Sequence, residues 1–362
     1  MAEFSGNKGE WSEVYVFLRL LESGKLYAAD ANMKRKANNS YFPVKEIYRA
    51  ETQDKKAVYT ITDDNVIVFV NDALKKSIKT TALKKYAEQI FAGILGGSES
   101  SFSIPGAEKI MDDILCTKLK APSEKKADIL LKIHDMQTGV DQISGFSIKS
   151  ELGHAPTLLN ASDATNFVYR VTGLSDSDID NINAIDTHRK IMDRIDEIRR
   201  KTATFEYVGL ANDTFFGNLM HIDSMMDQIL AEMVKISYFE NKLDMIQLVD
   251  ELERGNFLDF PRKGIYRYKI KKFLSSIALG MMPSVEWNGR DEANGGYIVA
   301  TETGDVLAFH IYNRDDFEDY LLKNTKLERA SSKRHNYCNV FKFEDEPDEC
   351  YIKLNLQIRF IK

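Results

Sequence analysis

The chain has 362 residues and a formal net charge of −6, and 43% of its residues are hydrophobic and 29% charged. This composition excludes wholesale disorder, and no apolar run reaches the ~20 residues that a membrane helix needs. The negative charge argues against a protein that coats nucleic acid by bulk attraction, but it does not exclude a locally basic cleft that grips DNA.

The length predicts two domains, because single hydrophobic cores stop growing at roughly 250 to 300 residues. The three cysteines, Cys116, Cys338 and Cys350, are odd in number and lack CxxC spacing. That pattern argues against a disulfide framework and against a zinc site. The first ten residues contain no basic region followed by an apolar one. We therefore expect no secretory signal and a cytoplasmic location.

The N-terminal part of the chain combines helical and strand-like patterns. Apolar residues recur at helical spacing from Glu10 to Glu22, and Gly24 is suited to end this helix. On it, Glu10 and Glu13 lie three residues apart and neighbour each other on one side. The segments that follow predict strands at Val44–Tyr48, Val58–Ile61 and Val66–Val70, a helix from Asp72 as its cap to Ala92, and a helix over Gly106–Cys116.

The segment from Lys126 to Glu151 predicts a β-hairpin. Aliphatic and β-branched residues dominate both ends, and residues 137–139 supply turn chemistry. Because strand side chains alternate between faces, pairing can bring Asp128 beside Lys149, with Ser147 and Glu151 on the same face as the lysine. An acid that can hold a divalent metal, next to a lysine that can orient water, is the minimum apparatus for metal-assisted phosphodiester hydrolysis.

The second half of the chain predicts long helices followed by a terminal sheet. Stripes of isoleucine and methionine at helical spacing indicate packing faces. We expect helices over Ser177–Lys201, His221–Arg254 and Arg314–Lys323, a loop over Gly209–Gly217, a hairpin over Gly295–Ile311, and strands over Tyr337–Phe343 and Cys350–Phe360.

The hairpin and the sequence around it resemble a known protein family. Asp128 and Lys149 look like the first metal-binding acid and the lysine of the PD-(D/E)xK nuclease superfamily. The segment Gly145–Gly153 and the sequence after it are similar to type II restriction endonucleases, most closely to the HpaII-like family. Further blocks carry the resemblance over nearly the whole chain: Asn7–Tyr15, Pro156–Ser162, Thr165–Phe167, His310–Asn313, Asn324–Glu328 and Leu354–Phe360.

One position departs from the superfamily pattern. The acid expected two residues before the lysine is replaced by Ser147, whose neutral hydroxyl is a poor ligand for a hard cation. The second acid must then come from Glu151 or from the N-terminal helix, through Glu10 or Glu13. Glu13 is the first choice, since the superfamily often uses a glutamate on a helix before the sheet, and Glu151 is the alternative on the face of Lys149. An alternative interpretation fits Glu10 and Glu13 equally well: both are solvated glutamates in a first helical turn, where the helix dipole favours negative charge.

Three segments are candidates for contacts with DNA. Residues 157–167, after the hairpin, are rich in small hydrogen-bonding side chains, which can contact phosphates and base edges. Such side chains also cap helices, which is the competing explanation. A strongly basic stretch at Arg262–Lys272 holds six basic residues and no acid, although a solvated helix face has the same composition. A basic loop at Asn324–His335 offers arginines that can bind guanine bidentately. The residues that we expect to contact DNA are Thr157, Asn160, Asn166, Arg267, Lys269, Lys326, Arg329 and Arg334.

The resemblance implies a type II restriction endonuclease of α/β (α+β) class. It implies a restriction-endonuclease-like core of mixed sheet flanked by helices over 1–175, a helical region over 176–255 and an α+β recognition region over 256–362. Catalysis would use Asp128, Lys149, Glu13 and Ser147, with Mg²⁺ held by Asp128 and one of the glutamates. It further implies 5′-phosphate ends and a CCGG target in double-stranded DNA, a possible homodimer and a cognate DNA methyltransferase as system partner.

Two other functions stay open. One is a DNA-binding module that keeps the nuclease fold without hydrolysis, which the neutral Ser147 favours. The other is a scaffold built on the long helices, with negligible affinity for duplex DNA. The sequence contains no P-loop, no GxGxxG after a strand, no GxSxG and no HExxH. Other familiar chemistries therefore have no motif in support.

Overall fold

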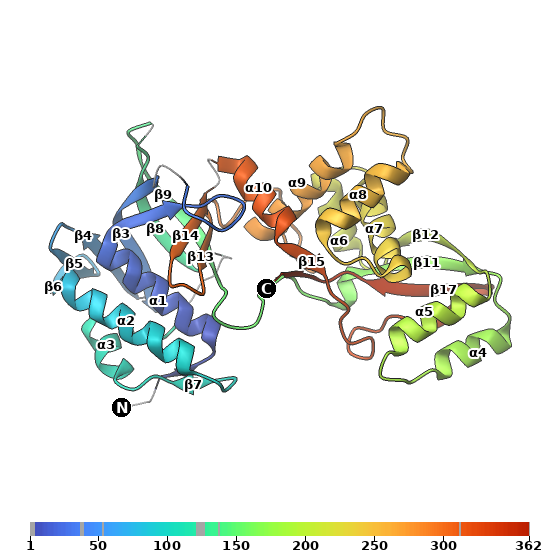
Figure 1. Cartoon of the computed structure of the whole chain (residues 1–362), viewed down its shortest axis with the longest axis horizontal. Helices are drawn as coiled ribbons and strands as arrows, with labels where there is room; N and C mark the ends of the chain where they lie inside the picture. Colours follow the sequence, from blue (N-terminus) through green and yellow to red (C-terminus); the bar gives the residue numbers. More distant parts are fainter. Residues whose placement is uncertain are drawn as a thin grey trace. The chain divides into compact units, whose positions relative to one another are not determined.

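The computed structural model describes residues 4–36, 40–52, 54–120, 127–136, 138–310 and 313–361. They divide into two compact units (Figure 1). Unit 1 comprises the described residues up to 156 together with 291–320, and unit 2 comprises 157–290 and 321–361. This division differs from the three consecutive regions expected from the sequence. Residues 291–320 belong to unit 1 because their hairpin extends its sheet.

Unit 1 is built around a nine-stranded mixed sheet in the order β2-β14-β13-β9-β8-β3-β4-β5-β6. Pairing is antiparallel except where β13 meets β9 and β14 meets β2. The predicted mixture of α and β structure is thereby confirmed. The strands are β2 (Lys25–Ala28), β3 (Tyr41–Thr52), β4 (Lys55–Ile61), β5 (Asn65–Val70), β6 (Ala73–Lys79), β8 (Ile129–His134), β9 (Asp141–Ser150), β13 (Gly296–Ala300) and β14 (Val306–His310), and β1 (Ser5–Gly6) pairs separately with β7 (Phe102–Ser103).

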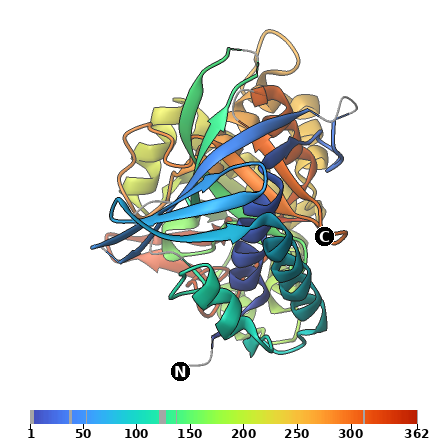
Figure 2. The same cartoon turned by 90° about the vertical axis from the view of Figure 1, so that its left-hand side faces the viewer.

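Helix α1 (Lys8–Ser23) packs beside α2 (Thr80–Gly96), as Figures 1 and 2 show from two sides. The predicted helix is confirmed, and its ends follow from its sequence. Asn7 caps the first turn in a capping box with Glu10, and Gly24 ends the helix in the left-handed conformation. Its apolar face joins α2, α3 (Ala107–Asp113) and the sheet in one buried core that includes Trp11. This core fixes α1 against the strands that carry the candidate site.

Unit 2 combines two small antiparallel sheets with helices. One sheet has the order β12-β11-β17-β16 and the other β10-β18-β15. Its strands are β10 (Thr157–Leu159), β11 (Asn166–Thr172), β12 (Thr204–Leu210), β15 (Thr325–Leu327), β16 (Val340–Phe343), β17 (Glu346–Asn355) and β18 (Ile358–Phe360). Its helices are a 3-10 turn (Asp163–Thr165), α4 (Asp176–Ala184), α5 (Lys190–Arg200), α6 (Asp213–Ile222), α7 (Met226–Glu240), α8 (Met245–Gly255) and α9 (Ile265–Leu279), and α10 (Arg314–Lys323) follows β14 along the chain.

The helix expected from Asp72 to Ala92 is wrong in its first part. Residues 73–79 form β6, which pairs with β5, and α2 begins only at Thr80. Asp72 lies in a turn with φ of 63° and is not the cap. Few apolar side chains mark this segment: Ile78 lies opposite Val66 and is buried, whereas Leu74 lies opposite Phe69, past a register shift, and is exposed. Pairing with β5 therefore decided the conformation.

The long helices expected in the second half are interrupted. Residues 177–201 form α4 and α5, and the stretch 221–254 contains α7 and α8, with Asn241 ending α7 in the left-handed conformation. Arg194 donates hydrogen bonds to the carbonyl groups of Asn183 and Ile185 at the end of α4. The expected loop over 209–217 is wrong, because β12 and α6 occupy most of it. None of the helices in the described ranges is long and apolar enough to cross a membrane.

Candidate active site

The predicted hairpin of β8 and β9 is confirmed, and it fixes the carboxylate of Asp128. The strands pair antiparallel with Ile129 opposite Phe146, and the backbone N–H of Asp128 donates to the Phe146 carbonyl at 2.8 Å. One carboxylate oxygen, Oδ2, accepts from the Ser147 hydroxyl at 3.0 Å and from the Ile148 N–H at 2.8 Å. These bonds from β9 hold Asp128 in one orientation. Part of the expected turn, residue 137, lies outside the described residues.

Helix α1 brings Glu13 to this carboxylate. Its neighbour Ser12 is fully buried, and the hydroxyl groups of Ser12 and Ser150 lie 2.7 Å apart, which ties α1 to the end of β9. The Glu13 side chain is 13% exposed. Burial, and then the negative charge of Asp128, raise the pKa of Glu13 to about 7. Glu10, in contrast, accepts from the Asn7 N–H and completes the helix cap.

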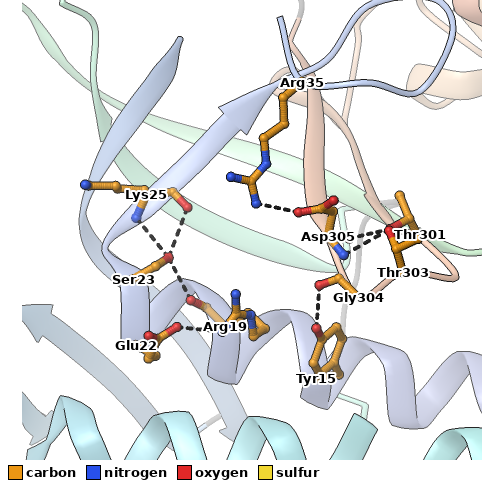
Figure 3. A network of polar contacts seen from close by, with 10 residues as sticks. All are labelled: Tyr15, Arg19, Glu22, Ser23, Lys25, Arg35, Thr301, Thr303, Gly304 and Asp305. Carbon is orange, nitrogen blue, oxygen red and sulfur yellow. Dashed lines mark hydrogen bonds and ion pairs between the residues drawn. The ribbon is translucent and has the colours of Figure 1, made fainter. Parts of the chain in front are cut away.

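The opposite side of α1 is held by the turn between β13 and β14, drawn in Figure 3. The Tyr15 hydroxyl donates to the Gly304 carbonyl at 2.5 Å. Asp305, next in that turn, forms an ion pair with Arg35 and donates its N–H to Thr301 Oγ1 at 3.0 Å. Since β13 is paired with β9, α1 is anchored to two adjoining parts of the sheet. Glu13 is thereby kept at a fixed place relative to the hairpin.

Lys120 contacts both carboxylates. Its Nζ lies 3.5 Å from Glu13 Oε1 and 3.4 Å from Asp128 Oδ1. The two acids can therefore share one cation between them. Carboxylate oxygens are the ligands that Mg²⁺ prefers, so these residues fit a divalent ion. Sequence reasoning did not find Lys120, because it belongs to no strand or helix pattern and follows no motif.

Lys149 lies on the same face of β9 as Ser147, two residues further along. It is half-buried, and its Nζ lies 5.2 Å from the centre of the Tyr297 ring. Burial lowers the pKa of Lys149, and the charge of Asp128 acts in the opposite direction. The ammonium group thus lies within the electrostatic field of the two acids.

A hollow of about 750 Å³ opens beside these residues within unit 1. Glu13 and Lys149 both line it, together with the polar side chains of Lys8, Ser98 and His154. The hollow is therefore wide enough for a ligand to reach both an acid and the lysine.

Glu151, the alternative second acid, has a different position. Strand β9 ends at Ser150, and the Glu151 N–H donates to the Ala300 carbonyl at 3.0 Å. Its charge acts on Tyr320, where it adds to the effect of burial in raising the pKa of the phenol. Across the described part of the chain, no group of three or more histidine, cysteine, aspartate or glutamate side chains is placed to hold a metal. The carboxylates that the structure brings together are those of Glu13 and Asp128.

Comparisons with known proteins identify the family of the chain. The model of the HpaII restriction endonuclease family matches residues 7–360. The type II restriction enzyme HpaII of Haemophilus parainfluenzae is 37% identical over 364 aligned positions, which cover 99% of both chains. The chain belongs to the HpaII restriction endonuclease family. The predicted type II restriction endonuclease is thereby confirmed, and no solved structure gives a significant match.

In this HpaII-family enzyme, the basic stretch at 262–272 falls in and just before α9, and the charges of its two chosen residues are paired. Arg267 donates to Asp250 at 2.7 Å. Lys269 forms an ion pair with Asp223, and its side chain is only 17% exposed. The positive charge of this stretch is therefore partly neutralised in the fold, by acids that lie outside the stretch.

The remaining DNA-contact candidates of the HpaII-family enzyme differ in exposure. Asn166 is 1% exposed, and its amide bonds to the His335 carbonyl and to Asn355, so it is part of the core of unit 2. Arg329 donates to the Ser237 carbonyl at 2.9 Å and to Asn241 at 3.0 Å. Arg329 is half-buried, as are Thr157 in β10 and Lys326 in β15. Asn160 and Arg334 are exposed.

Proposed function

We propose that this HpaII-family enzyme hydrolyses double-stranded DNA at CCGG with Mg²⁺ held by Asp128 and Glu13, and that it leaves 5′-phosphates. The observation that carries the proposal is the shared position of the two carboxylates, each within 3.5 Å of a single ammonium group. The CCGG target rests on membership of the family. In this proposal unit 1 is the restriction-endonuclease-like core of the PD-(D/E)xK type, since its mixed sheet carries the hairpin and its first helix carries Glu13.

The hydrogen bonds of Asp128 give Ser147 a role in this proposal. Oδ2 is occupied by the Ser147 hydroxyl and the Ile148 N–H, whereas Oδ1 faces Lys120. Oδ1 is therefore the oxygen that is turned toward a cation. Ser147 acts by positioning the acid, and Glu13 supplies the second carboxylate that the serine cannot.

Lys149 is the residue proposed to hold the attacking water. When bound, Mg²⁺ supplies a polarised phosphate and a water of lowered pKa. Lys149, on the same strand face as Ser147, is placed to orient that water and to offset the charge that develops on the phosphate. Because Lys149 is a half-buried residue and its ammonium group lies beside the Tyr297 ring, the position of that group is restricted and its charge is less screened by solvent than at the surface.

Plasmid cleavage tests the proposal. A supercoiled plasmid with one CCGG site should be linearised in Mg²⁺ and left intact in EDTA, and a matched plasmid without the site should stay uncut. Sequencing of the ends should show 5′-phosphates within CCGG. Lys149→Ala should abolish cutting, whereas Lys45→Ala, at an exposed lysine of the same sheet, should cut normally. Cleavage in EDTA, or equal cleavage by the Lys149→Ala variant, would refute the assignment.

The DNA-binding module without hydrolysis, which the sequence left open because of Ser147, disagrees with membership of a family of type II restriction enzymes. It predicts tight binding of a CCGG duplex in Ca²⁺ or Mg²⁺ with no product after long incubation. Gel-shift and cleavage assays on the same duplex separate the two proposals, because only the nuclease converts bound duplex to product in Mg²⁺.

The proposal extends to partners. CCGG is a two-fold symmetric sequence, and symmetric sites are commonly matched by two-fold symmetric proteins. We therefore propose a homodimer on DNA, which sedimentation with and without the duplex would test. A cognate methyltransferase that protects CCGG, and a cytoplasmic location beside the host DNA, complete the proposed restriction system.

A further inference from the structure

Lys120 is the residue of the site that the proposed mechanism does not use. Its ammonium group lies between the two acids, 3.5 Å from Glu13 Oε1 and 3.4 Å from Asp128 Oδ1. Its side chain is 52% exposed, whereas those of the two acids are 13% and 14% exposed. The lysine thus reaches from the solvent side onto a pair of largely buried carboxylates.

The backbone that leads to Lys120 is fixed by a buried ion pair. Arg49 and Glu51 are 8% and 0% exposed and bind each other through the guanidinium and a carboxylate oxygen. The other oxygen of Glu51 accepts from the N–H of Thr117 at 2.7 Å and from its hydroxyl at 2.6 Å. Arg49 donates to the carbonyl groups of Lys118 and Leu119, the latter at 3.3 Å. These bonds hold the segment 117–119 in place, so Lys120 is positioned at the acids by the fold.

A divalent ion and this ammonium group require the same oxygens. An ammonium at hydrogen-bonding range would repel a cation bound to the carboxylates, and the repulsion is strong where solvent is largely excluded. Without a cation, Glu13 and Asp128 would repel each other in turn, because both are largely buried. One cation between the two carboxylates, either the ammonium group or the divalent ion, is therefore favourable, and both together are not.

We propose that Lys120 is a resident counter-cation that competes with the divalent ion for the Glu13–Asp128 pair. In the free protein it offsets part of the negative charge of the two acids, and it leaves them when the ion binds. This inference rests on the proposed function, since it assumes that the pair is the metal site. It assigns to Lys120 a weakening of metal affinity before DNA is bound.

Direct binding of Ca²⁺ to the full chain without DNA tests the competition. Isothermal titration calorimetry should give a Kd for Lys120→Met that is about 5 to 10 times lower than that of the intact chain, because the competing charge is gone. Lys120→Arg keeps the charge and should keep the weaker binding. The matched control is Lys118→Met, an exposed lysine of the same segment, which should bind Ca²⁺ like the intact chain.

Thermal unfolding in EDTA and in Ca²⁺ gives a second readout that does not depend on activity. In EDTA the Lys120→Met variant should unfold at a lower temperature than the intact chain, because its acids repel without a counter-charge. Saturating Ca²⁺ should raise its midpoint more than that of the intact chain. A folded Lys120→Met variant with an unchanged Kd for Ca²⁺ and an unchanged rise of its unfolding midpoint in Ca²⁺ would overturn this inference and leave the proposed metal site standing. If neither the intact chain nor Lys120→Met binds Ca²⁺, the inference and the proposed metal site both fail.

Discussion

The hairpin of unit 1 and helix α9 of unit 2 carry the two strongest sequence signals. The neighbours of the hairpin residues are those expected from the sequence, whereas those of the α9 residues are not. In the hairpin, Asp128 and the strand of Lys149 meet as expected, because paired strands joined by a short turn fix which residues are neighbours. In α9, Arg267 and Lys269 face Asp250 and Asp223, acids that no local pattern connects to them.

This contrast separates relations that a local sequence specifies from those that depend on the whole fold. A geometric relation between two paired strands is set by backbone hydrogen bonds over a few residues. The net charge of a surface depends on every chain segment that folds onto it, including distant acids. Candidate catalytic residues in the hairpin were therefore easier to place than candidate DNA contacts in α9.

Replacing Asp128 should give the largest effect. Asp128→Asn keeps the shape of the side chain but removes the charge proposed to hold the ion, and it should slow single-turnover cleavage of a CCGG duplex by at least ~10³-fold. Asp141→Asn, at an exposed acid at the other end of the same hairpin, is the matched control and should cleave normally. An Asp128→Asn enzyme with more than a tenth of the normal rate would contradict the proposed role.

Breaking the buried ion pair of unit 1 should destabilise the protein strongly. Glu51→Ala leaves the Arg49 guanidinium buried without its partner, at a cost of about 3 to 5 kcal/mol in the free energy of unfolding. Urea denaturation measures it. For comparison, Glu206→Ala removes an exposed partner of Arg170 in unit 2 and should leave the urea midpoint unchanged. Equal shifts for the two variants would show that burial is not the deciding factor.

The raised pKa of Glu13 predicts a pH-dependent stability in EDTA. Its folded pKa of about 7 lies above the ordinary 4.5, so the contribution of this group is fully present below pH 4.5 and is lost as pH rises through 7. Urea unfolding from pH 4.5 to 8 should show the intact chain losing on the order of 2 kcal/mol relative to Glu13→Gln. Parallel curves for the two proteins would mean that Glu13 titrates normally.

The smallest effects concern DNA binding by single basic residues of unit 2. Arg334 is exposed, and among the described residues its side chain forms no ion pair, so Arg334→Met should reduce the salt dependence of binding by about one counterion. Lys269→Met removes a charge already neutralised by Asp223 and should leave the slope unchanged. Fluorescence anisotropy with a CCGG duplex in Ca²⁺ measures both slopes. If the salt dependence of DNA binding fell in Lys269→Met and not in Arg334→Met, the paired lysine and not the exposed arginine would be the residue that contacts DNA.

Elements with strong local signals could be predicted from the amino-acid sequence alone. The helix before Gly24, the hairpin at 126–151 and the hairpin at 295–311 have clear periodicity and turn residues, and all three form as predicted. The family resemblance was likewise readable from motifs in the chain. The helix predicted from Asp72 failed at 73–79, because this segment has little apolar periodicity of its own and its pairing with β5 makes it a strand.

Which side chains gather around Asp128, in contrast, depends on how the chain packs in three dimensions. Glu13 was one of two open choices, and its position follows from the contact between Ser12 and Ser150 and from the bond between Tyr15 and Gly304, which join segments far apart in sequence. Lys120 carried no signal, because its place depends on the buried pair of Arg49 and Glu51. Hydrogen bonds and charges act through space, so a site assembled from separate segments is specified only when the whole core has packed.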